Sequence, residues 1–340
     1  MQFIVKFKMT NKFPYQLLSK SEMITQMNHF SALQIPFLFI VDFKGESGYI
    51  IQQNMINEDF VRFSTTVLDL NLTINSQIKA IEWQITPPSL SNYQKKFDFV
   101  VKQICLGNSF LTNLTQPSFI ETNLSLLDFH QKGSAKYKLW LKDQFVVLSP
   151  ETFIKINGHK ISAFPMKGTI DASIPNAEEQ ILNDPKEKAE HATIVDLIRN
   201  DLSLVAEEVE VNRYRYVEKL TTNQQDLLQV SSEISGTLAK NFHSRLGDIL
   251  FTLLPAGSIS GAPKPKTLEI IDEAEAYERG FYTGVCGFFD GENLDSAVMI
   301  RFIEQQEGQL IFKSGGGITA QSDLKKEYEE LIQKVYVPIS

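Results

Sequence analysis

The chain has 340 residues, 43% of them hydrophobic and 11% aromatic, with only 18 glycines and 13 prolines. This many apolar side chains can form a core, which excludes a disordered or collagen-like chain. The 33 basic and 41 acidic residues give a net charge of −8, so no overall basic field favours nucleic acid or an anionic membrane as a partner.

The first 85 residues predict short strands, for example at residues 36–43 and 48–53. A Thr-Pro-Pro-Ser break at residues 86–89 precedes a helix expected over Asn92–Leu106. We place the division of the chain at this break. Residues 1–85 are expected to be a short amino-terminal subdomain packed into the same fold, and residues 86–340 the main domain.

A β-hairpin is predicted around Asn157-Gly158, because both central residues of a type I′ turn need a positive φ. The flanking residues are rich in β-branched and aromatic side chains, as strands require. The predicted register pairs Ile156 with His159 across a two-residue turn.

This register places Glu151 opposite Phe164 at the open end of the hairpin. The segment Pro-Met-Lys-Gly-Thr follows at residues 165–169, and Lys167 is its third residue. Three residues span at most about 10 Å. A carboxyl and an amine are therefore expected to share one site there.

A long helix is expected to begin after Asp184, which can cap it. Pro185 suits the first helical position, and Glu187 completes a capping box with Asp184. The apolar series continues to Leu202. Glu187 and Glu190 are three residues apart, so they lie on one face of this helix.

Helices and strands alternate in the last third of the chain. Residues 257–264, Gly-Ser-Ile-Ser-Gly-Ala-Pro-Lys, form a loop of small residues, and three glycines occupy Gly315–Gly317. A final helix presents Glu327, Glu330 and Lys334 on one face. The other expected elements are a helix at Lys266–Glu278, strands at Thr283–Phe289, Asp295–Ile303 and Gln309–Lys313, and the final helix itself at about Asp323–Val335.

Acidic residues are concentrated in the second half of the chain. Residues 1–170 carry 17 basic and 12 acidic residues, and residues 171–340 carry 16 and 29, so the halves stand at +5 and −13. Two helices that each present Glu-x-x-Glu can place Glu187, Glu190, Glu327 and Glu330 around one Mg²⁺, which prefers oxygen ligands. A structural explanation of these glutamates, without a metal, stays open, because helix caps and i,i+4 surface ion pairs also use glutamate.

Three further features each have a chemical and a structural alternative. Lys167 is a nucleophile if its surroundings favour the neutral amine, and otherwise a solvated side chain. The Gly315–Gly317 run can offer backbone N–H groups to an anion or form a mobile loop. Arg301, in an apolar strand, can hold a substrate carboxylate or pair with an acidic residue of the protein. These residues alone predict an acidic, metal-dependent α/β enzyme that acts on a small anion.

A series of motifs follows in a recognisable order along the chain. They are Leu148-Ser-Pro-Glu151, Pro165-Met-Lys-Gly-Thr169, Glu187-Lys-Ala-Glu190-His-Ala-Thr-Ile-Val-Asp-Leu-Ile-Arg-Asn-Asp201, Gly257-Ser-Ile-Ser-Gly-Ala-Pro-Lys264, Tyr282-Thr-Gly284, Ile300-Arg301 and Gly315-Gly-Gly-Ile318 followed by Glu327-x-x-Glu330. Together they resemble the chorismate-utilising enzymes, over roughly residues 86–340. That family includes anthranilate synthase component I, aminodeoxychorismate synthase component I, and isochorismate and salicylate synthases.

The resemblance implies an α/β (α+β) fold like that of anthranilate synthase component I, with two packed β-sheets flanked by helices. It also implies a Mg²⁺ that binds the ring carboxylate of chorismate, with Glu190 and Glu330 as the principal carboxylates and Glu187 and Glu327 supporting them. The substrate-binding residues that it implies are Gly168 and Thr169 for the ring carboxylate, Tyr282, Arg301, Gly315, Gly316 and Gly317 for the enolpyruvyl carboxylate, and Lys334 near the metal.

Lys167 is the position that best separates the products of this family. A lysine there is similar to aminodeoxychorismate synthases, whereas anthranilate synthases usually carry a small residue. The resemblance implies that Lys167 attacks C2 of chorismate, Glu151 acts as general acid on the 4-hydroxyl, and ammonia then adds at C4 to give 4-amino-4-deoxychorismate, for 4-aminobenzoate and folate synthesis. Isochorismate and salicylate synthases use a water-activating lysine where this chain has Leu111.

One departure from the family pattern and one missing motif qualify this interpretation. Gln229 stands where relatives carry a histidine, and glutamine cannot shuttle protons. Neither cysteine lies in a glutaminase nucleophile motif, so the resemblance implies ammonia from a separate glutamine amidotransferase subunit (component II). Two alternatives stay open: anthranilate synthase component I, if Lys167 is a neutral substitution, and a catalytically silent chorismate-binding or partner-binding subunit.

The location of the protein is predicted from the lack of targeting signals. The longest apolar stretch, Ile35–Val41, is far shorter than a membrane span. Lys6 and Lys8 interrupt the apolar residues at the start of the chain, so no secretory core forms there. We expect a cytoplasmic protein with no membrane and no nucleic-acid partner.

Overall fold

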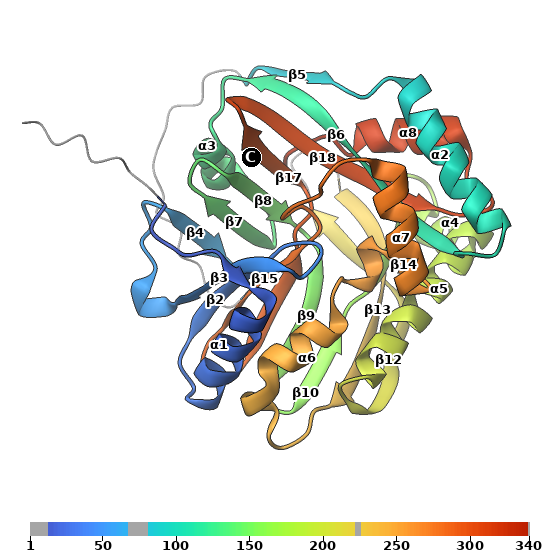
Figure 1. Cartoon of the computed structure of the whole chain (residues 1–340). Coiled ribbons are helices and arrows are strands. Elements are labelled where there is room, and N and C mark those ends of the chain that lie inside the picture. The colour runs from blue at the N-terminus through green and yellow to red at the C-terminus, as the bar shows by residue number, and fades with distance from the viewer. Residues whose placement is uncertain (1–12, 67–80, 222–225, 339–340) are drawn as a thin grey trace, which may run out of the picture.

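The computed structural model describes residues 13–66, 81–221 and 226–338, and two antiparallel β-sheets dominate them (Figure 1). The first sheet has the strand order β1 (Leu18–Ser19), β3 (Ser47–Gln52), β2 (Phe37–Val41), β15 (Val285–Phe289), β16 (Leu294–Val298), β9 (Thr152–Asn157), β10 (Lys160–Ala163), β13 (Asp226–Thr237) and β11 (Met166–Asp171), and β12 (Glu207–Thr221) also pairs with β13. The second has the order β14 (Gly261–Ala262), β6 (Leu111–Thr122), β18 (Gln309–Ile318), β17 (Phe302–Gln306), β8 (Phe145–Ser149), β7 (Tyr137–Leu141) and β4 (Val61–Ser64), and β5 (Trp83–Thr86) pairs with β6.

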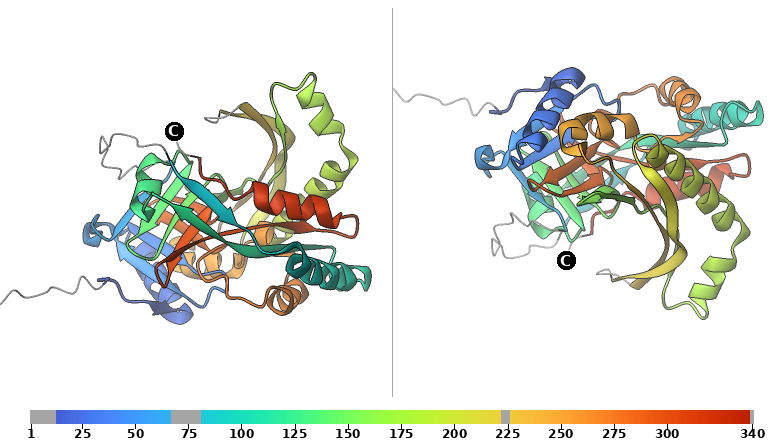
Figure 2. Two further views of the ribbon diagram at one scale, coloured as in Figure 1. Left: turned by 90° about the horizontal axis from the view of Figure 1, so that it is seen from above. Right: turned by 90° about the horizontal axis from the view of Figure 1, so that it is seen from below.

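Helices flank both sheets, as Figure 2 shows from above and below. They are α1 (Lys20–Ala32), α2 (Leu90–Cys105), α3 (Leu126–Lys132), α4 (Ala177–Asn183), α5 (Pro185–Ser203), α6 (Leu246–Leu253), α7 (Lys264–Glu275) and α8 (Leu324–Gln333), with short 3₁₀ turns η1 (Gln53–Met55), η2 (Phe242–Arg245) and η3 (Gly257–Ile259). The predicted α/β (α+β) fold of two sheets flanked by helices is confirmed.

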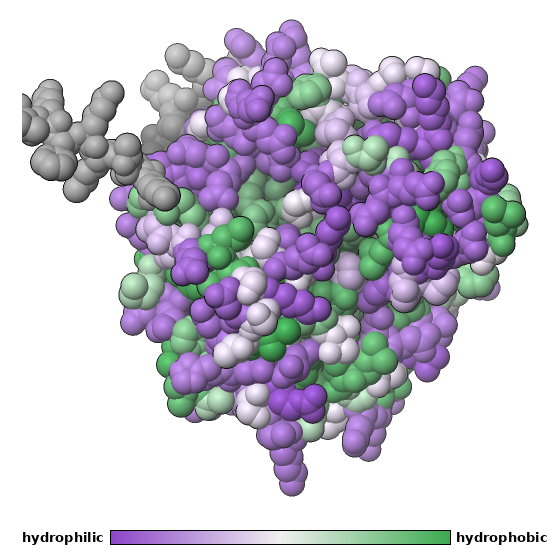
Figure 3. Space-filling model, in the orientation of Figure 1, coloured by the Kyte–Doolittle hydropathy of each residue, from purple (hydrophilic) through white to green (hydrophobic). Residues whose placement is uncertain are grey.

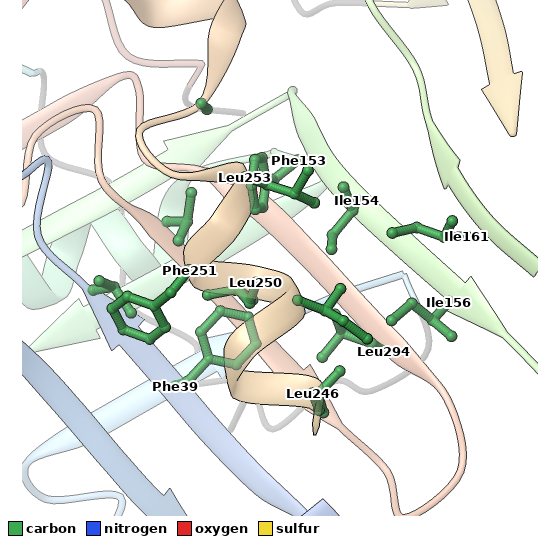
Figure 4. Packing of buried hydrophobic residues seen from close by; sticks show 14 of the residues in the cluster. Phe39, Phe153, Ile154, Ile156, Ile161, Leu246, Leu250, Phe251, Leu253 and Leu294 are labelled. Carbon is green, nitrogen blue, oxygen red and sulfur yellow. The ribbon is translucent and has the colours of Figure 1, made fainter. Parts of the chain in front are cut away.

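Strand β2 shows how the sequence builds a core on both faces of the first sheet. Its five residues are all buried. Because successive side chains alternate in a strand, Phe37 and Phe39 pack against the helical layer of α1 and α6, while Leu38 and Ile40 face the second sheet. Figure 4 shows Leu246 and Leu250 of α6 over the first of these faces.

The surface is largely polar, in keeping with the 22% of charged residues. Figure 3 shows mostly hydrophilic residues on the face that carries α1, α6 and α7, with smaller apolar areas between them. None of the helices in the described residues is long and apolar enough to cross a bilayer.

The amino-terminal segment contributes strands to both sheets. β2 pairs with β15, and β4 pairs with β7, each in antiparallel register. The break at residues 86–89 lies between β5 and α2, which begins at Leu90, close to the expected start. The division of the chain at this break stays a prediction.

The predicted hairpin forms, but its register is wrong by two residues. Asn157 pairs with Lys160, and Ile156 with Ile161 rather than with His159. Gly158 has a φ of 57°, whereas Asn157 remains in β9. The turn therefore consists of Gly158 and His159, and a glycine at the first central position suits a type II′ turn.

Two expectations for the last third of the chain are also wrong. The strand expected over Asp295–Ile303 is two strands, β16 and β17, in different sheets, because the chain crosses over at residues 299–301 with Arg301 at a φ of 52°. The glycines of Gly315–Gly317 are not a loop. They lie in β18, where Gly315 pairs with Thr115 of β6.

A buried ion pair joins the second sheet to the loop at residues 257–261. Arg279 and Glu275 are 2% and 1% exposed and lie 2.6 Å apart, between Arg279 Nη2 and Glu275 Oε1. Arg279 also donates to the carbonyls of Ile259 and Asn113, at 2.9 and 2.8 Å. The pair therefore ties three segments together.

We expect Glu275→Ala to lower the free energy of unfolding by about 3–5 kcal/mol, because it leaves a buried guanidinium uncompensated. Urea denaturation measures this loss. The matched control is Glu269→Ala, which removes the exposed pair with Lys266 and should cost less than about 1 kcal/mol. Equal losses in the two variants would contradict the prediction.

Candidate active site

Lys167 and Glu190 form the first half of the site. Lys167 lies in β11 and Glu190 in α5, and Lys167 Nζ is 3.0 Å from Glu190 Oε2. The two side chains are 25% and 11% exposed. The predicted helix start explains the position of Glu190, because Asp184 Oδ1 accepts a hydrogen bond from the backbone N–H of Glu187 at 3.0 Å.

Gly168 and Glu187 lie beside this pair. Gly168 has a φ of 84°, and a β-carbon there would lie 3.0 Å from Glu187 Oε2. Glycine is therefore needed both for the backbone conformation and for the close approach of the carboxylate. Thr169 is exposed and pairs across the sheet with Gln229.

Helix α8 supplies the second half of the site. Asp323 caps it by accepting hydrogen bonds from two backbone N–H groups, each at 3.1 Å. A β-carbon on Gly316 would lie 3.4 Å from Glu330 Oε1, 3.6 Å from Glu327 Oε2 and 3.7 Å from Lys334 Nζ. The expectation that these three side chains share one face of the helix is confirmed.

The glycine strand lies between the two halves. A β-carbon on Gly317 would lie 3.3 Å from Lys167 Nζ and 2.9 Å from Leu111 Cδ1. Lys334 Nζ donates to the carbonyl of Gly315 at 3.0 Å and binds Glu330 Oε1 at 2.6 Å. β18 therefore passes beside the α8 side chains at Gly316 and beside Lys167, which binds Glu190 of α5, at Gly317.

Glu151 is the partly buried carboxyl that the hairpin was expected to bring near Lys167. Ser258 Oγ donates a hydrogen bond to Glu151 Oε1. Burial raises the pKa of Glu151, while Ser258 and the positive charges of Lys167, Arg301 and Lys334 oppose that rise without cancelling it. A carboxyl whose pKa is raised is suited to donate a proton.

Arg301 and Tyr282 line the same region. Within residues 13–66, 81–221 and 226–338, no carboxylate lies within ion-pair distance of Arg301, whose guanidinium stacks on the ring of Tyr336 at 4.8 Å. Tyr282 is buried, and burial raises its pKa. The structure thus favours the alternative in which Arg301 is available for a carboxylate of a ligand.

The four glutamates provide oxygen donors of the kind that Mg²⁺ prefers. In the described part of the chain, no three acidic, histidine or cysteine side chains form a ready metal centre. Instead, an amine binds a carboxylate in each half, Lys167 with Glu190 and Lys334 with Glu330. The donors fit the ion in chemistry, and the space at Gly316 is bordered by the oxygens of Glu327 and Glu330.

Sequence reasoning missed two contributors to this site. His191 is fully buried next to Glu190, its Nε2 is 2.7 Å from Ser232 Oγ, and burial and the nearby Arg215 and Lys167 lower its pKa to about 4. Ser258 binds Glu151. Both stand inside quoted motifs, so the signal was present, but nothing in the spacing showed what they contact.

Comparison with known proteins gives one family and several relatives. The family model for chorismate binding enzymes matches residues 57–340. An uncharacterised PabA-like protein of Pasteurella multocida is 50% identical over 323 residues, which cover 95% of this chain and all of the relative. Aminodeoxychorismate synthase component 1 of Escherichia coli is 32% identical over 271 residues, covering 75% of this chain and 58% of the relative. The crystal structure of anthranilate synthase component I from Streptococcus pneumoniae superposes with a TM-score of 0.65 and 26% identity, over 74% of this chain and 58% of that one.

Proposed function

The chain belongs to the chorismate-binding enzyme family, and we propose that within it the chain aminates chorismate at C4 to give 4-amino-4-deoxychorismate. The resemblance to an aminodeoxychorismate synthase and to an anthranilate synthase covers similar shares of the chain, 75% and 74%. Overall similarity therefore does not choose between the two products. The observation that carries the choice is the amine of Lys167 at the centre of the site.

Lys167 Nζ lies 3.0 Å from Glu190 and 3.3 Å from where a β-carbon on Gly317 would sit. It therefore borders the space at the glycines of β18. Attack on chorismate requires the neutral amine, so the ion pair with Glu190 opens before the reaction. Leu111 at the edge of this space cannot activate water, which argues against an isochorismate product.

The proposed reaction has two balanced steps. In the first, the amine of Lys167 forms a bond to C2, the C4–O bond breaks, and the hydroxyl takes a proton from Glu151 and leaves as water. In the second, ammonia bonds to C4, the C2–N bond breaks and the neutral Lys167 amine is regenerated, and the ammonium formed at C4 returns one proton to Glu151. Arg301 and the backbone of the glycine strand would hold the enolpyruvyl carboxylate, and Gly168 and Thr169 the ring carboxylate.

We propose Mg²⁺ as the cofactor, held by Glu190 and Glu330 with Glu187 and Glu327 in support. Its chemistry there would be to neutralise and orient the ring carboxylate. Ammonia would come from a separate glutamine amidotransferase subunit, and the relative from Escherichia coli is itself named as component 1 of its synthase. The product would then enter 4-aminobenzoate and folate synthesis in the cytoplasm.

The product assay tests this proposal. Purified protein is incubated with chorismate, Mg²⁺ and ammonium, and an aminodeoxychorismate lyase is then added. We expect 4-aminobenzoate. Anthranilate, isochorismate or salicylate in its place would overturn the assignment.

Gln229 favours one competing function. It lies across the sheet from Thr169, at a position where the resemblance implies a histidine, and it offers no titratable group. A catalytically silent subunit would bind chorismate, as calorimetry can detect, without forming any product when Mg²⁺ and ammonia are supplied.

We expect Glu330→Ala to weaken the binding of Mg²⁺, since a ligand carboxylate is lost. The Mg²⁺ concentration needed for half-maximal binding of chorismate should rise by about 10-fold or more. Titration of Mg²⁺ at a fixed concentration of chorismate measures the shift. The control is Glu329→Ala, which removes the exposed neighbouring carboxylate on α8 and should leave the Mg²⁺ titration unchanged. An unchanged Mg²⁺ titration in Glu330→Ala would remove this residue from the metal site.

A further inference from the structure

We propose that Ser258 is a positioning residue, which fixes the oxygen of Glu151 that carries the catalytic proton. The inference rests on Glu151 as the general acid of the proposed function. A protonated carboxyl has one hydroxyl oxygen and one carbonyl oxygen. Because the Ser258 hydroxyl donates to Oε1, Oε1 is held as the acceptor and the proton belongs on Oε2.

The turn that carries Ser258 is firmly anchored. Asn113 N–H donates to the carbonyl of Ser260 at 2.8 Å, and Arg279 donates to the carbonyl of Ile259 at 2.9 Å. The Ser260 hydroxyl donates to the carbonyl of Ala256 at 2.9 Å. Ser258 therefore approaches Glu151 from a backbone that is fixed on both sides of it.

The backbone of Glu151 is held equally well. Its N–H donates to Ser149 Oγ at 3.1 Å, and its carbonyl accepts a hydrogen bond from Val298 N–H at 3.1 Å. Two fixed segments from different parts of the chain thus meet at one hydrogen bond. Because both backbones are held, the hydrogen bond from Ser258 fixes the orientation of the Glu151 carboxyl.

Three positively charged side chains influence the pKa of Glu151. Lys167 on β11, Arg301 at the crossover between the sheets and Lys334 at the end of α8 all favour the carboxylate, and burial favours the neutral acid. The Ser258 hydrogen bond also favours the carboxylate, so it lowers the pKa of Glu151. Removal of the hydroxyl should therefore raise the pKa.

A cavity beside the pair makes a sharp test possible. It has a volume of about 30 Å³ and is lined by Glu151, Ser258, Gly257, Asp201 and apolar side chains. That volume leaves room for one additional methyl group near Ser258. Ser258→Thr and Ser258→Val give side chains of the same branched shape, of which only threonine keeps the hydroxyl.

The experiment follows the carbonyl stretch of protonated Glu151 by infrared spectroscopy of the free protein as the pH is varied, with Glu151→Gln identifying the band. We expect Ser258→Thr to titrate like the original chain and Ser258→Val to titrate about one pH unit higher, the size of one hydrogen bond to a charged group. Ser244→Ala, an exposed serine whose hydroxyl donates to the carbonyl of Asn241 away from the site, is the control and should leave the titration unchanged.

Kinetics supply the second readout. Ser258→Val should lower kcat for chorismate about 10-fold with KM unchanged, and Ser258→Thr should restore it. The inference would be overturned if Glu151 in Ser258→Val titrated at the same pH as in the original chain, or if Ser258→Thr did not restore kcat. Should Ser258→Val fail to fold, Ser258→Ala takes its place in both measurements. The infrared titration needs no turnover, so it stands even if the product assay shows a different product.

Discussion

Lys167→Ala is expected to lower the rate of chorismate amination by at least about 10³-fold, the scale on which loss of a catalytic nucleophile is felt. The amine lies 3.0 Å from Glu190 and next to Gly317, and alanine offers no atom that can bond to C2. Initial rates with ammonium as the amine source measure the loss directly.

The same variant should also lose the covalent intermediate. Without ammonia, the original chain is expected to retain the chorismate-derived group on Lys167, which mass spectrometry of the intact protein detects. The matched control is Lys160→Ala on strand β10 of the same sheet, a lysine that is 53% exposed and paired with Glu233. Undiminished turnover in Lys167→Ala would remove Lys167 from the role of nucleophile and favour anthranilate synthase chemistry.

The helices of the site could be predicted because their signals are local. Asp184 is the cap that the sequence predicts for α5, and the structure has it in place, while Asp323 caps α8 close to the expected start of that helix. Once a helix is fixed, residues three and four apart must share a face. Glu327, Glu330 and Lys334 therefore reach Gly316 together, as expected.

The strands could be predicted only in part, because their partners lie far away in the chain. Residues 294–306 look like one strand, yet the pairing of β16 with β9 and of β17 with β8 places them in different sheets. The glycines of β18 look like a loop. They are tolerated in a strand because a β-carbon on Gly315 would lie 2.5 Å from the carbonyl oxygen of Leu114, so only glycine fits beside β6.

The wrong hairpin register did not change the strands beside which Glu151 and Lys167 were expected to lie. The turn moved by one residue, to Gly158 and His159, and the pairing by two, but Glu151 still lies just before β9 and Lys167 in β11. Ser258 could not be found in this way, because it approaches Glu151 from 107 residues further along the chain. Contacts of that kind depend on how the two sheets pack, which no local pattern specifies.

Glu151→Gln is expected to lower kcat by about 10²- to 10⁴-fold, the usual contribution of a general acid. Glutamine keeps the shape and can still accept the hydrogen bond from Ser258, but it has no acidic proton to give to the departing hydroxyl. The exposed Glu278→Gln is the control, since it makes the same chemical change on the surface.

The pH dependence of kcat gives this prediction its sign. Burial raises the pKa of Glu151, so Glu151 stays protonated to a higher pH than an ordinary glutamate. The first step of the reaction, which needs that proton, therefore also continues to a higher pH. As the pH rises through that pKa, the carboxyl ionises and kcat should fall. Glu151→Gln has no such group, so its low residual rate should not show this decline. A decline at the same pH in both proteins would assign the titration to another residue and leave Glu151 without the role of acid.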